Sequence, residues 1–422
     1  MSCESSGNGC GKGLAYVTTT TSGCHTLISK SSYYRILLEK NGFKLTDDPG
    51  KASLIIVNTC GSGDFEEENS YKVIDELMRS KHEGAELIIV GCMVALYRER
   101  IRGKYGVEVF GLAEEEELSR YLELKNGLAD GDLRYGGDIK SLNEDLGRFS
   151  RYWAVLDGIN RFFIRVLPPL GRTLSLYHNT TYSYSPGTYL IQVCTGCVYN
   201  CSFCMEKKVK SSVKSRDLES IIHEFRLAVN KGFKHFVVVS DDLSSYGVDL
   251  SGGPVNYITL LHEIFRIKGD FTLELLNLNP QGLHGRLDDF LDSIVPGRIK
   301  CIILSLQSGS DRILGLMNRG YNRAQFMDYA NAILEKDSSI SLKTYVIVGF
   351  PSETEEDFQQ TLDIIDKIPF GKVIALGYDE KKGIDSNMIA SKVPSSVISQ
   401  RKRRILLKHY KVMAGYLMSQ IL

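Results

Sequence analysis

The chain has 422 residues, of which 43% are hydrophobic and 24% charged, and this composition excludes a wholly disordered protein. Its 51 lysines and arginines equal its 51 acidic residues, so binding of nucleic acid through bulk charge alone is not expected, although a local basic patch is compatible with this balance. Residues 1–30 lack the pattern of a signal peptide, and no apolar run reaches the ~18 residues of a membrane span. We therefore expect a cytoplasmic protein without membrane contact.

Three short aliphatic segments mark the first regular region, at residues 14–17, 54–57 and 87–90. Segments with helical spacing of their apolar residues lie between them. Buried parallel strands have this aliphatic character, and intervening helices give a β-α-β-α-β order. The sequence therefore predicts an α/β domain with a doubly wound parallel sheet over residues 1–112.

Residues 113–186 show a weaker pattern, and we expect a linker with some helix there. The acidic run at 114–117 is consistent with a helix start, because acids favour that end of a helix, or with a solvated face. We prefer the solvated face. The sequence assigns no role to this linker.

From residue 188 the alternation becomes regular again. Strands are predicted at 189–193, 236–240, 271–276, 301–306, 344–348 and 373–376, and helices at 217–230, 255–267, 287–294, 323–334 and 355–365. Six strands with intervening helices predict a partial (β/α)6 barrel over residues 187–392, with its reactive face at the carboxyl ends of the strands.

Residues 393–422 predict one basic amphipathic helix. Its basic residues are Arg401, Lys402, Arg403, Arg404, Lys408 and Lys411. Its apolar residues are Ile405, Leu406, Tyr410, Met413 and Leu417. We expect this apolar set to dock on the barrel.

Ten cysteines in a cytoplasmic protein indicate metal ligands rather than disulfides. Cys197, Cys201 and Cys204 form a C-x3-C-x2-C motif directly after a predicted strand. Three thiolates on one loop can hold three irons of a 4Fe–4S cluster and leave the fourth iron open for a ligand. Cys194 leaves an alternative open, because with it four thiolates could close around a structural zinc ion. Its position in phase with the strand equally suits a small buried hydrophobic residue.

Cys24, Cys60 and Cys92 form a second set, because each follows one of the N-terminal strands. The carboxyl ends of parallel strands share one edge of the sheet, where ligands bind. Any one of these cysteines could be an unrelated buried residue, but three at similar positions indicate a second metal site.

The C-x3-C-x-aromatic-C loop on the first barrel strand resembles that of the radical S-adenosylmethionine (SAM) superfamily. With the three N-terminal cysteines, the chain resembles the methylthiotransferase family over residues 14–112 and 187–392. The blocks that carry the resemblance are SGCHTLISKSSYYRILLEKNGFKLTDDPGKASLIIVNTC, VVVSDDLSSYGVD, LSLQSGSDRILGLMNRGY and YVIVGFPSETEEDF, in this order.

This resemblance implies an enzyme with two 4Fe–4S clusters and SAM as cofactors. The Cys197/Cys201/Cys204 cluster would cleave SAM reductively, and the resulting radical would take a hydrogen atom from an unactivated carbon of the substrate. The Cys24/Cys60/Cys92 cluster would carry the sulfur that a second SAM methylates. An electron donor such as flavodoxin or ferredoxin would be a partner.

The resemblance also predicts which residues contact SAM at the strand ends of the barrel. These residues are Phe203, Asp241, Asp242, Gln307, Ser308 and Gly349. The two aspartates are expected to bind the amino group of SAM, the Gln–Ser pair its ribose, and the phenylalanine and glycine its adenine. Each polar residue has the alternative role of forming a turn or capping a helix, and close backbone approach to adenine would explain the glycine.

The chain also departs from the family pattern in several places. Met205 and Glu206 stand where the family usually has Ile-Pro or similar, Glu274 where it often has arginine, and Ser305 where it often has proline. The family's usual C-terminal TRAM domain is not recognised in the sequence. These departures leave the chemistry intact and put the substrate in doubt.

Known branches of the family modify a tRNA adenosine or an aspartate of a ribosomal protein. Balanced charge and the lack of a recognised TRAM domain argue against tRNA, because phosphate contacts normally supply much of that affinity. We expect methylthiolation of a peptide or protein side chain at a β-carbon, for example in a ribosomally made precursor peptide.

Two other functions stay open. A tRNA adenosine methylthiotransferase could use the basic segment 401–411. A non-catalytic zinc-binding interaction protein would not explain the barrel motifs. Oligomeric state, sulfur donor and any role of Cys3, Cys10, Cys194 and Cys301 are not predicted.

Overall fold

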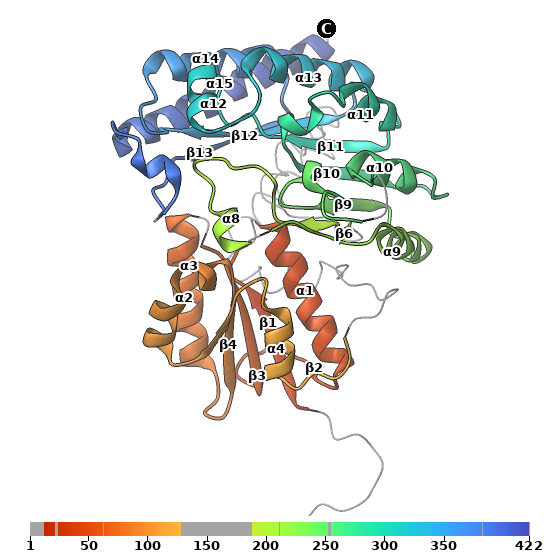
Figure 1. Cartoon of the computed structure of the whole chain (residues 1–422), viewed down its shortest axis with the longest axis vertical. Helices are drawn as coiled ribbons and strands as arrows, with labels where there is room; N and C mark the ends of the chain where they lie inside the picture. The colour runs from red at the N-terminus through yellow and green to blue at the C-terminus, as the bar shows by residue number, and fades with distance from the viewer. Residues whose placement is uncertain are drawn as a thin grey trace, which may run out of the picture. The chain divides into compact units, whose positions relative to one another are not determined.

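The structure is a computed structural model that describes residues 12–21, 24–61, 63–127, 188–210, 212–251, 255–381 and 383–421. The chain divides into two compact units, residues 1–137 and 138–422 (Figure 1). Most of the expected linker at 113–186 lies outside the described residues, as do Cys3 and Cys10. Within the described residues, no helix combines the length and the apolar character that a membrane span requires.

The first unit contains a five-stranded parallel sheet in the order β2-β1-β3-β4-β5. Its strands are β1 (Leu14–Thr19), β2 (Lys44–Leu45), β3 (Leu54–Thr59), β4 (Glu86–Gly91) and β5 (Glu108–Phe110). The three strands predicted from aliphatic segments are confirmed as β1, β3 and β4, and they lie side by side. The short edge strands β2 and β5 lack such a segment, so the sequence pattern did not predict them.

Helices cover both faces of this sheet, which explains why β3 is buried throughout and β4 is buried at every residue after Glu86. The helices are α1 (His25–Lys40), α2 (Asp64–Ser80), α3 (Cys92–Tyr105) and α4 (Glu115–Tyr121). Ile74 of α2 and Met93 of α3 pack on one face, while Tyr34 of α1 and Leu118 of α4 pack on the other. The acidic run thus opens a helix and is not merely a solvated face: its acids occupy the first turn of α4, and buried Leu118 anchors the helix.

The second unit contains a six-stranded parallel sheet in the order β13-β12-β11-β10-β9-β6. Its strands are β6 (Thr188–Gln192), β9 (His235–Val239), β10 (Thr272–Leu278), β11 (Ile299–Leu304), β12 (Ser341–Val348) and β13 (Lys372–Gly377). β6 and β13 are the edge strands, as a partial barrel requires. The α/β fold class predicted from the sequence is therefore confirmed.

The five predicted helices lie in the connections between these strands. They are α9 (Leu218–Asn230), α10 (Tyr257–Phe265), α11 (Leu287–Ser293), α13 (Arg323–Lys336) and α14 (Glu355–Lys367). Shorter elements were not predicted: α8 (Glu206–Val209), α12 (Asp311–Leu316), and a small antiparallel ladder of β7 (Cys194–Thr195) and β8 (Lys214–Ser215). They have too few residues to show a periodic pattern.

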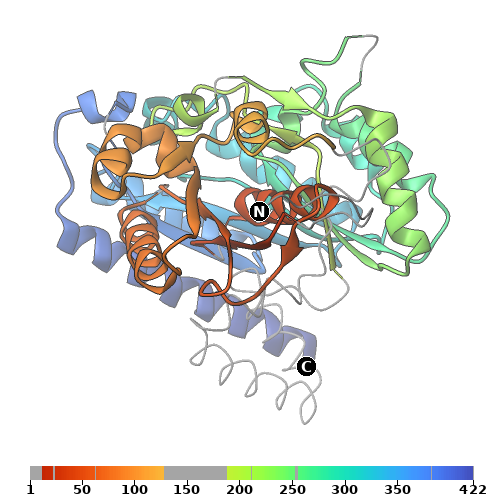
Figure 2. The ribbon, with the colours of Figure 1, turned by 90° about the horizontal axis from the view of Figure 1, so that it is seen from below.

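Helix α15 (Ser395–Ile421), the long dark blue helix of Figure 2, packs against β13 and α14. Its buried face is formed by residues spaced four apart: Arg401, Ile405, His409 and Met413. Leu406 and Tyr410 were expected on this face but are 42% and 52% exposed, so that part of the prediction is wrong. The side chain of Leu417 lies outside the description. Arg401 also lies on this buried face, and a search for apolar residues at helical spacing cannot assign an arginine to such a face.

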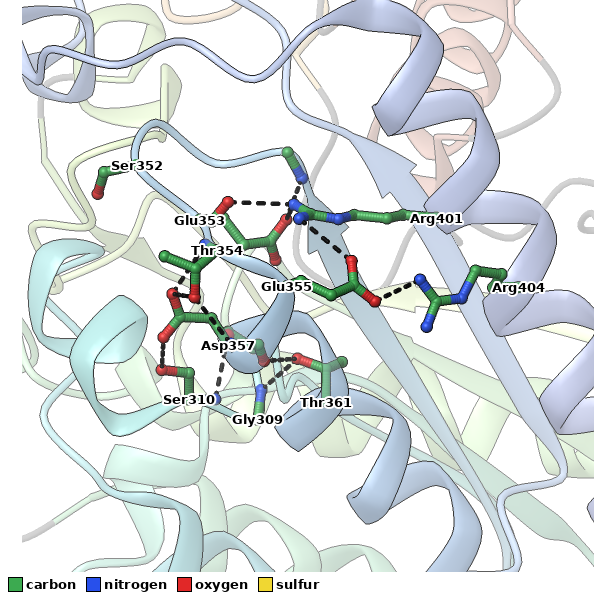
Figure 3. Close-up of polar contacts among 12 residues, drawn as sticks. Gly309, Ser310, Ser352, Glu353, Thr354, Glu355, Asp357, Thr361, Arg401 and Arg404 are labelled. Carbon is green, nitrogen blue, oxygen red and sulfur yellow. Dashed lines mark hydrogen bonds and ion pairs between the residues drawn. The ribbon is translucent and has the colours of Figure 1, made fainter.

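Arg401 is buried because an ion pair compensates its charge. Its Nη1 lies 2.6 Å from Glu353 Oε2, and these side chains are 6% and 1% exposed. The same carboxylate accepts the Gly349 N–H at 2.6 Å. Figure 3 shows Arg401 directed at Glu353 and Glu355, with Arg404 on the outer side of Glu355. Burial raises the pKa of Glu353 although Arg401 opposes this effect, so the carboxylate depends on its partner.

We expect Arg401→Leu to lower the free energy of unfolding of the second unit by about 3–5 kcal/mol, because it leaves the Glu353 carboxylate buried without its cation. The control Arg404→Leu removes a half-exposed ion pair and should cost less than about 1 kcal/mol. Adding Glu353→Gln to Arg401→Leu should restore part of the loss. Denaturant unfolding measures all three, and equal losses for the two arginine variants would contradict this account.

Candidate functional site

The predicted cluster loop, residues 196–204, follows β7, and the end of β9 holds its first part. The Gly196 N–H donates to Asp241 at 2.7 Å, and the Val198 N–H donates to Ser245 Oγ at 3.1 Å. Gly196 has a φ of +81°, and a Cβ there would lie 2.3 Å from the Ser212 carbonyl oxygen. A glycine is therefore required at the point where the chain turns into the cluster loop.

The segment after α12 holds the second part of the cluster loop. The Ser202 N–H donates to the Met317 carbonyl at 3.1 Å, and the Asn318 side-chain amide donates to the Asn200 carbonyl at 2.7 Å. Asn318 has a φ of +56°, a conformation that asparagine tolerates better than most residues. Two segments thus fix this loop: the first lies 45–47 residues further along the chain than the residues it holds, and Asn318 of the second lies 118 residues beyond Asn200.

Two cysteines of the cluster loop have a hydrogen-bond donor at their sulfur. At the third, Cys197, Ser245 and the Tyr199 N–H lower the pKa of the thiol, but less than burial raises it. Cys201 Sγ accepts from Arg319 Nη1 at 3.1 Å, and Cys204 Sγ accepts from the Glu206 N–H at 3.4 Å. Donors directed at cysteine sulfurs are a recurrent feature of iron–sulfur sites, where they tune the cluster.

Burial sets the protonation of two of these thiols, Cys197 and Cys204. It raises the pKa of Cys197 to about 12, with Asp242 adding to the effect, and raises the pKa of Cys204 to about 12, with Glu206 adding to it. Such thiols become thiolates only when a metal supplies compensating positive charge. Within the described residues, no three His, Cys, Asp or Glu side chains meet the geometry of a metal site. The fit to an iron–sulfur cluster therefore rests on the donor set and its hydrogen bonds.

Cys194 differs from the other cysteines of this region. It is 1% exposed, pairs with Ser215 in the β7–β8 ladder, and directs its Sγ at the Asp242 carbonyl at 3.6 Å. A sulfur that donates to a carbonyl is a protonated thiol, and burial raises the pKa of Cys194 well above its usual value. This geometry fits a small buried residue and does not support a fourth zinc ligand.

The two aspartates predicted to bind SAM hold backbone segments. Asp242 caps the short helix η2 (Leu243–Ser245) and accepts from both serines of that helix and from the Asn279 N–H. Asp241 accepts from Gly196 and forms an ion pair with Lys210 at 2.5 Å. The capping alternative therefore describes what both carboxylates do in the structure, and their contact with SAM stays a prediction.

Gln307 and Ser308 follow β11, and their surroundings differ. The Ser308 hydroxyl is fully buried and accepts the Ser310 N–H at 3.2 Å. Gln307 has a φ of +66°, and its backbone bridges to β12. Its side-chain Oε1 is buried and has no hydrogen-bond partner among the described residues. An unsatisfied buried acceptor suits a ligand hydroxyl, which supports the predicted ribose contact at Gln307 without testing it.

Gly349 and Phe203 both lie near the segment that follows β12. Gly349 has a φ of +78°, and a Cβ there would lie 2.3 Å from Ile398 Cγ1. Packing against α15 thus requires this glycine, which differs from the expected reason, an approach to adenine. Phe203 packs against an apolar cluster that includes Phe350 and Tyr378. The structure therefore brings the phenylalanine of the cluster loop next to the segment that follows β12.

The N-terminal cysteines lie where adjacent strands end. Cys60 follows β3 directly, Cys92 is the first residue of α3 after β4, and Cys24 is the N-cap of α1, which follows β1. The register pairs Thr59 with Gly91, so Cys60 and Cys92 follow paired residues. This arrangement suits a common ligand at the sheet edge, and the ligand role of these cysteines stays a prediction.

Gly91 is the residue that allows this turn into α3. Its φ is +115°, and a Cβ would lie 2.4 Å from the Thr59 carbonyl oxygen. Next to it, the Cys60 N–H donates to Thr20 Oγ1 and Ser70 Oγ at 3.2 Å each. Strand ends, helix starts and hydroxyl side chains together fix the backbone at this edge.

The sequence argument missed Arg319, Ser245 and Asn279. Arg319 stands in the matched block LSLQSGSDRILGLMNRGY, but its sulfur partner lies 118 residues away. No spacing rule detects such a pair. A positive residue in a block that follows a predicted strand end was the only available signal.

Two family profiles match the chain. "Radical SAM superfamily" matches residues 191–365, and "Uncharacterized protein family UPF0004" matches residues 16–111. The radical SAM methyltransferase TsrM from Kitasatospora setae is similar in fold, with a TM-score of 0.55 and 14% identity over 86% of this chain and 72% of that chain. The second unit is thus that of a radical SAM enzyme.

Curated relatives show which kind of radical SAM enzyme the chain is similar to. A tRNA-2-methylthio-N(6)-dimethylallyladenosine synthase from Carboxydothermus hydrogenoformans is 28% identical over 92% of this chain and 81% of the relative. A ribosomal protein uS12 methylthiotransferase from Chlamydia caviae is 24% identical over 95% of this chain and 81% of the relative. The chain belongs to the radical SAM methylthiotransferase family, whose members are sulfur-transferring enzymes that use SAM and two 4Fe–4S clusters. The family expected from the motifs is confirmed.

Asp357 at the start of α14 fixes the loop that carries Gln307 and Ser308. Its carboxylate accepts from Ser310 Oγ at 2.6 Å and from Thr354, as Figure 3 shows. It also accepts from Arg312 Nη2 at 2.5 Å. Burial raises the pKa of this carboxyl, but these hydrogen bonds outweigh burial and hold the pKa well below its usual range. The ionised form therefore stabilises the folded state.

A carboxyl group whose pKa is lower in the folded state stabilises that state at pH values above its unfolded pKa of about 4. This contribution to stability is lost as the pH falls from there through the folded-state pKa. We expect Asp357→Asn to lower the free energy of unfolding at about pH 7 by at least about 1 kcal/mol, and to weaken the loss of stability between about pH 5 and about pH 2. Urea unfolding at several pH values measures this. The exposed control Asp292→Asn should change little; an unaltered pH profile in Asp357→Asn would refute the assignment.

Proposed function

We propose that the chain transfers a methylthio group to an adenosine of tRNA, with a 4Fe–4S cluster at Cys197, Cys201 and Cys204 and a second at Cys24, Cys60 and Cys92. When bound, SAM and the two clusters supply the radical that removes a hydrogen atom and the sulfur that replaces it. The observation that carries the reaction is the cluster loop, which brings three cysteines together and gives the sulfurs of Cys201 and Cys204 fixed hydrogen-bond donors.

The relatives support tRNA as the first candidate substrate. Several of them, from Carboxydothermus hydrogenoformans to Methanocaldococcus jannaschii, carry names of tRNA-modifying enzymes. A protein side chain is the second candidate, because other relatives are named for ribosomal protein uS12. The precursor peptide expected from the sequence has no counterpart among these names, so we no longer place it first.

Helix α15 offers fewer positive charges to RNA than its sequence indicated. Arg401, Arg404 and Lys408 form ion pairs with the acidic residues Glu353, Glu355 and Asp366. Lys402, Arg403 and Lys411 are exposed. We infer that this helix contributes a small number of phosphate contacts and does not replace a full RNA-binding domain.

Iron and acid-labile sulfide in anaerobically prepared protein test the two cluster sites. We expect about eight irons in the wild type and about four in the Cys197→Ala/Cys201→Ala/Cys204→Ala variant, because each site holds four. The control Cys194→Ala should keep about eight, since this buried thiol is not a ligand. About four irons that fall to none in the triple variant would mean that the N-terminal cysteines hold no cluster, and stoichiometric zinc without sulfide would refute both sites.

Product formation tests the substrate. We expect that the anaerobic enzyme with SAM, sulfide, a one-electron reductant and tRNA yields a methylthio-adenosine nucleoside, detected by mass spectrometry after digestion of the tRNA. Parallel reactions contain ribosomal protein uS12 in place of tRNA. Modification of uS12 alone would replace the first candidate by the second, and SAM cleavage without modification of either would refute both substrates.

A further inference from the structure

Arg319 directs one nitrogen of its guanidinium at the central cysteine of the cluster loop. Its Nη1 lies 3.1 Å from Cys201 Sγ, within hydrogen-bonding distance of a sulfur acceptor. Arg319 follows α12 and is half-buried. The contact therefore joins a barrel residue to the loop, and it lies in a partly desolvated place where charge acts strongly.

The other nitrogens of Arg319 keep the guanidinium in this orientation. Nη2 donates to Asn279 Oδ1 at 2.9 Å and to the Ser305 carbonyl at 3.2 Å, while Nε donates to Tyr321 Oη at 3.3 Å. Tyr321 is anchored in turn, because its hydroxyl donates to the Ser305 and Leu306 carbonyls. The planar fork is thus held by the ends of β10 and β11, so that little ordering is needed when it acts on the sulfur.

The positive charge of Arg319 has no carboxylate partner among the described residues. Its hydrogen-bond acceptors are an amide oxygen, a carbonyl, a hydroxyl and the sulfur of Cys201. The ion pairs of this unit show the contrasting arrangement, as at Arg216, which pairs with Glu224 at 2.6 Å. A half-buried cation without an anionic partner is unfavourable unless an anion forms nearby. An anionic iron–sulfur cluster bound at Cys201 would provide that anion, with its ligand sulfur 3.1 Å from the guanidinium.

We propose that Arg319 is a positioning residue that stabilises the one-electron-reduced state of the cluster held by Cys201. This inference rests on the cluster site proposed above. Reduction adds one electron from an external one-electron donor, breaks no bond and moves no proton, so the negative charge of the cluster increases by one. A fixed cation at a ligand sulfur favours that additional charge, and it therefore raises the reduction potential.

The test is a redox titration monitored by electron paramagnetic resonance. It uses the Cys24→Ala/Cys60→Ala/Cys92→Ala background, so that one cluster gives the signal, and compares Arg319→Gln and Arg319→Lys with that background. Glutamine keeps hydrogen-bond donors and loses the charge. We expect Arg319→Gln to lower the equilibrium constant for one-electron reduction of the cluster about tenfold, which lowers the reduction potential by about 59 mV. Arg319→Lys should retain most of the native potential.

Arg323→Gln is the matched control. It makes the same substitution at another arginine of this unit, whose Nη2 pairs with Asp363 at 3.7 Å and not with a cysteine of the cluster loop. Its potential should equal that of the background. An Arg319→Gln variant with native iron content and an unchanged potential would overturn the proposal.

Iron content separates the remaining outcomes. If Arg319→Gln loses its iron, Arg319→Lys decides: retained iron with a near-native potential supports the charge, and loss of iron from both overturns the proposal in favour of a purely structural arginine. If the background protein itself holds no iron, the cluster site of the proposed function fails and not only the role of Arg319.

Discussion

Three half-buried thiols must stay together on a segment that has almost no regular structure of its own, and the remaining parts of the second unit are organised around this requirement. The segment after β9, which includes η2, supplies Asp241 and Ser245, and these side chains hold the first part of the cluster loop. The segment after α12 supplies Asn318 and Arg319, which hold the second part. Without both anchors the backbone of the cluster loop would lose the side chains that fix it, and the sulfur of Cys201 would lose its donor.

The same principle extends outward from the cluster loop. Asp357 ties the loop after β11 to the start of α14, and Glu353 ties the loop after β12 to Arg401 of α15. Each carboxylate is buried and each serves a backbone segment at a strand end. Helix α15 is thus part of the support of the barrel face, and its packing against Ile398 explains why residue 349 must be glycine.

Much of the fold could be predicted from the sequence because it depends on local patterns. Aliphatic runs predicted β3 and β4, which the structure confirms. Cysteine spacing predicts the cluster loop, since three thiolates within eight residues have few other uses, and the ligand role of these cysteines stays a prediction. The contacts that organise the site could not be predicted in this way. Arg319 and Cys201, or Arg401 and Glu353, meet only after strands and helices have packed. The exposed positions of Leu406 and Tyr410 show the same limit, because a buried ion pair at Arg401 shifted the packed face of α15.

The central claim is that two cysteine sets divide the chemistry: one for cleavage of SAM and one for the sulfur. The most direct test measures 5′-deoxyadenosine and methylthio product in the same anaerobic reaction. The Cys24→Ala/Cys60→Ala/Cys92→Ala variant should still form 5′-deoxyadenosine and yield no methylthio product, whereas the Cys197→Ala/Cys201→Ala/Cys204→Ala variant should form neither. Methylthio product from the first variant would contradict the division of roles between the two sets.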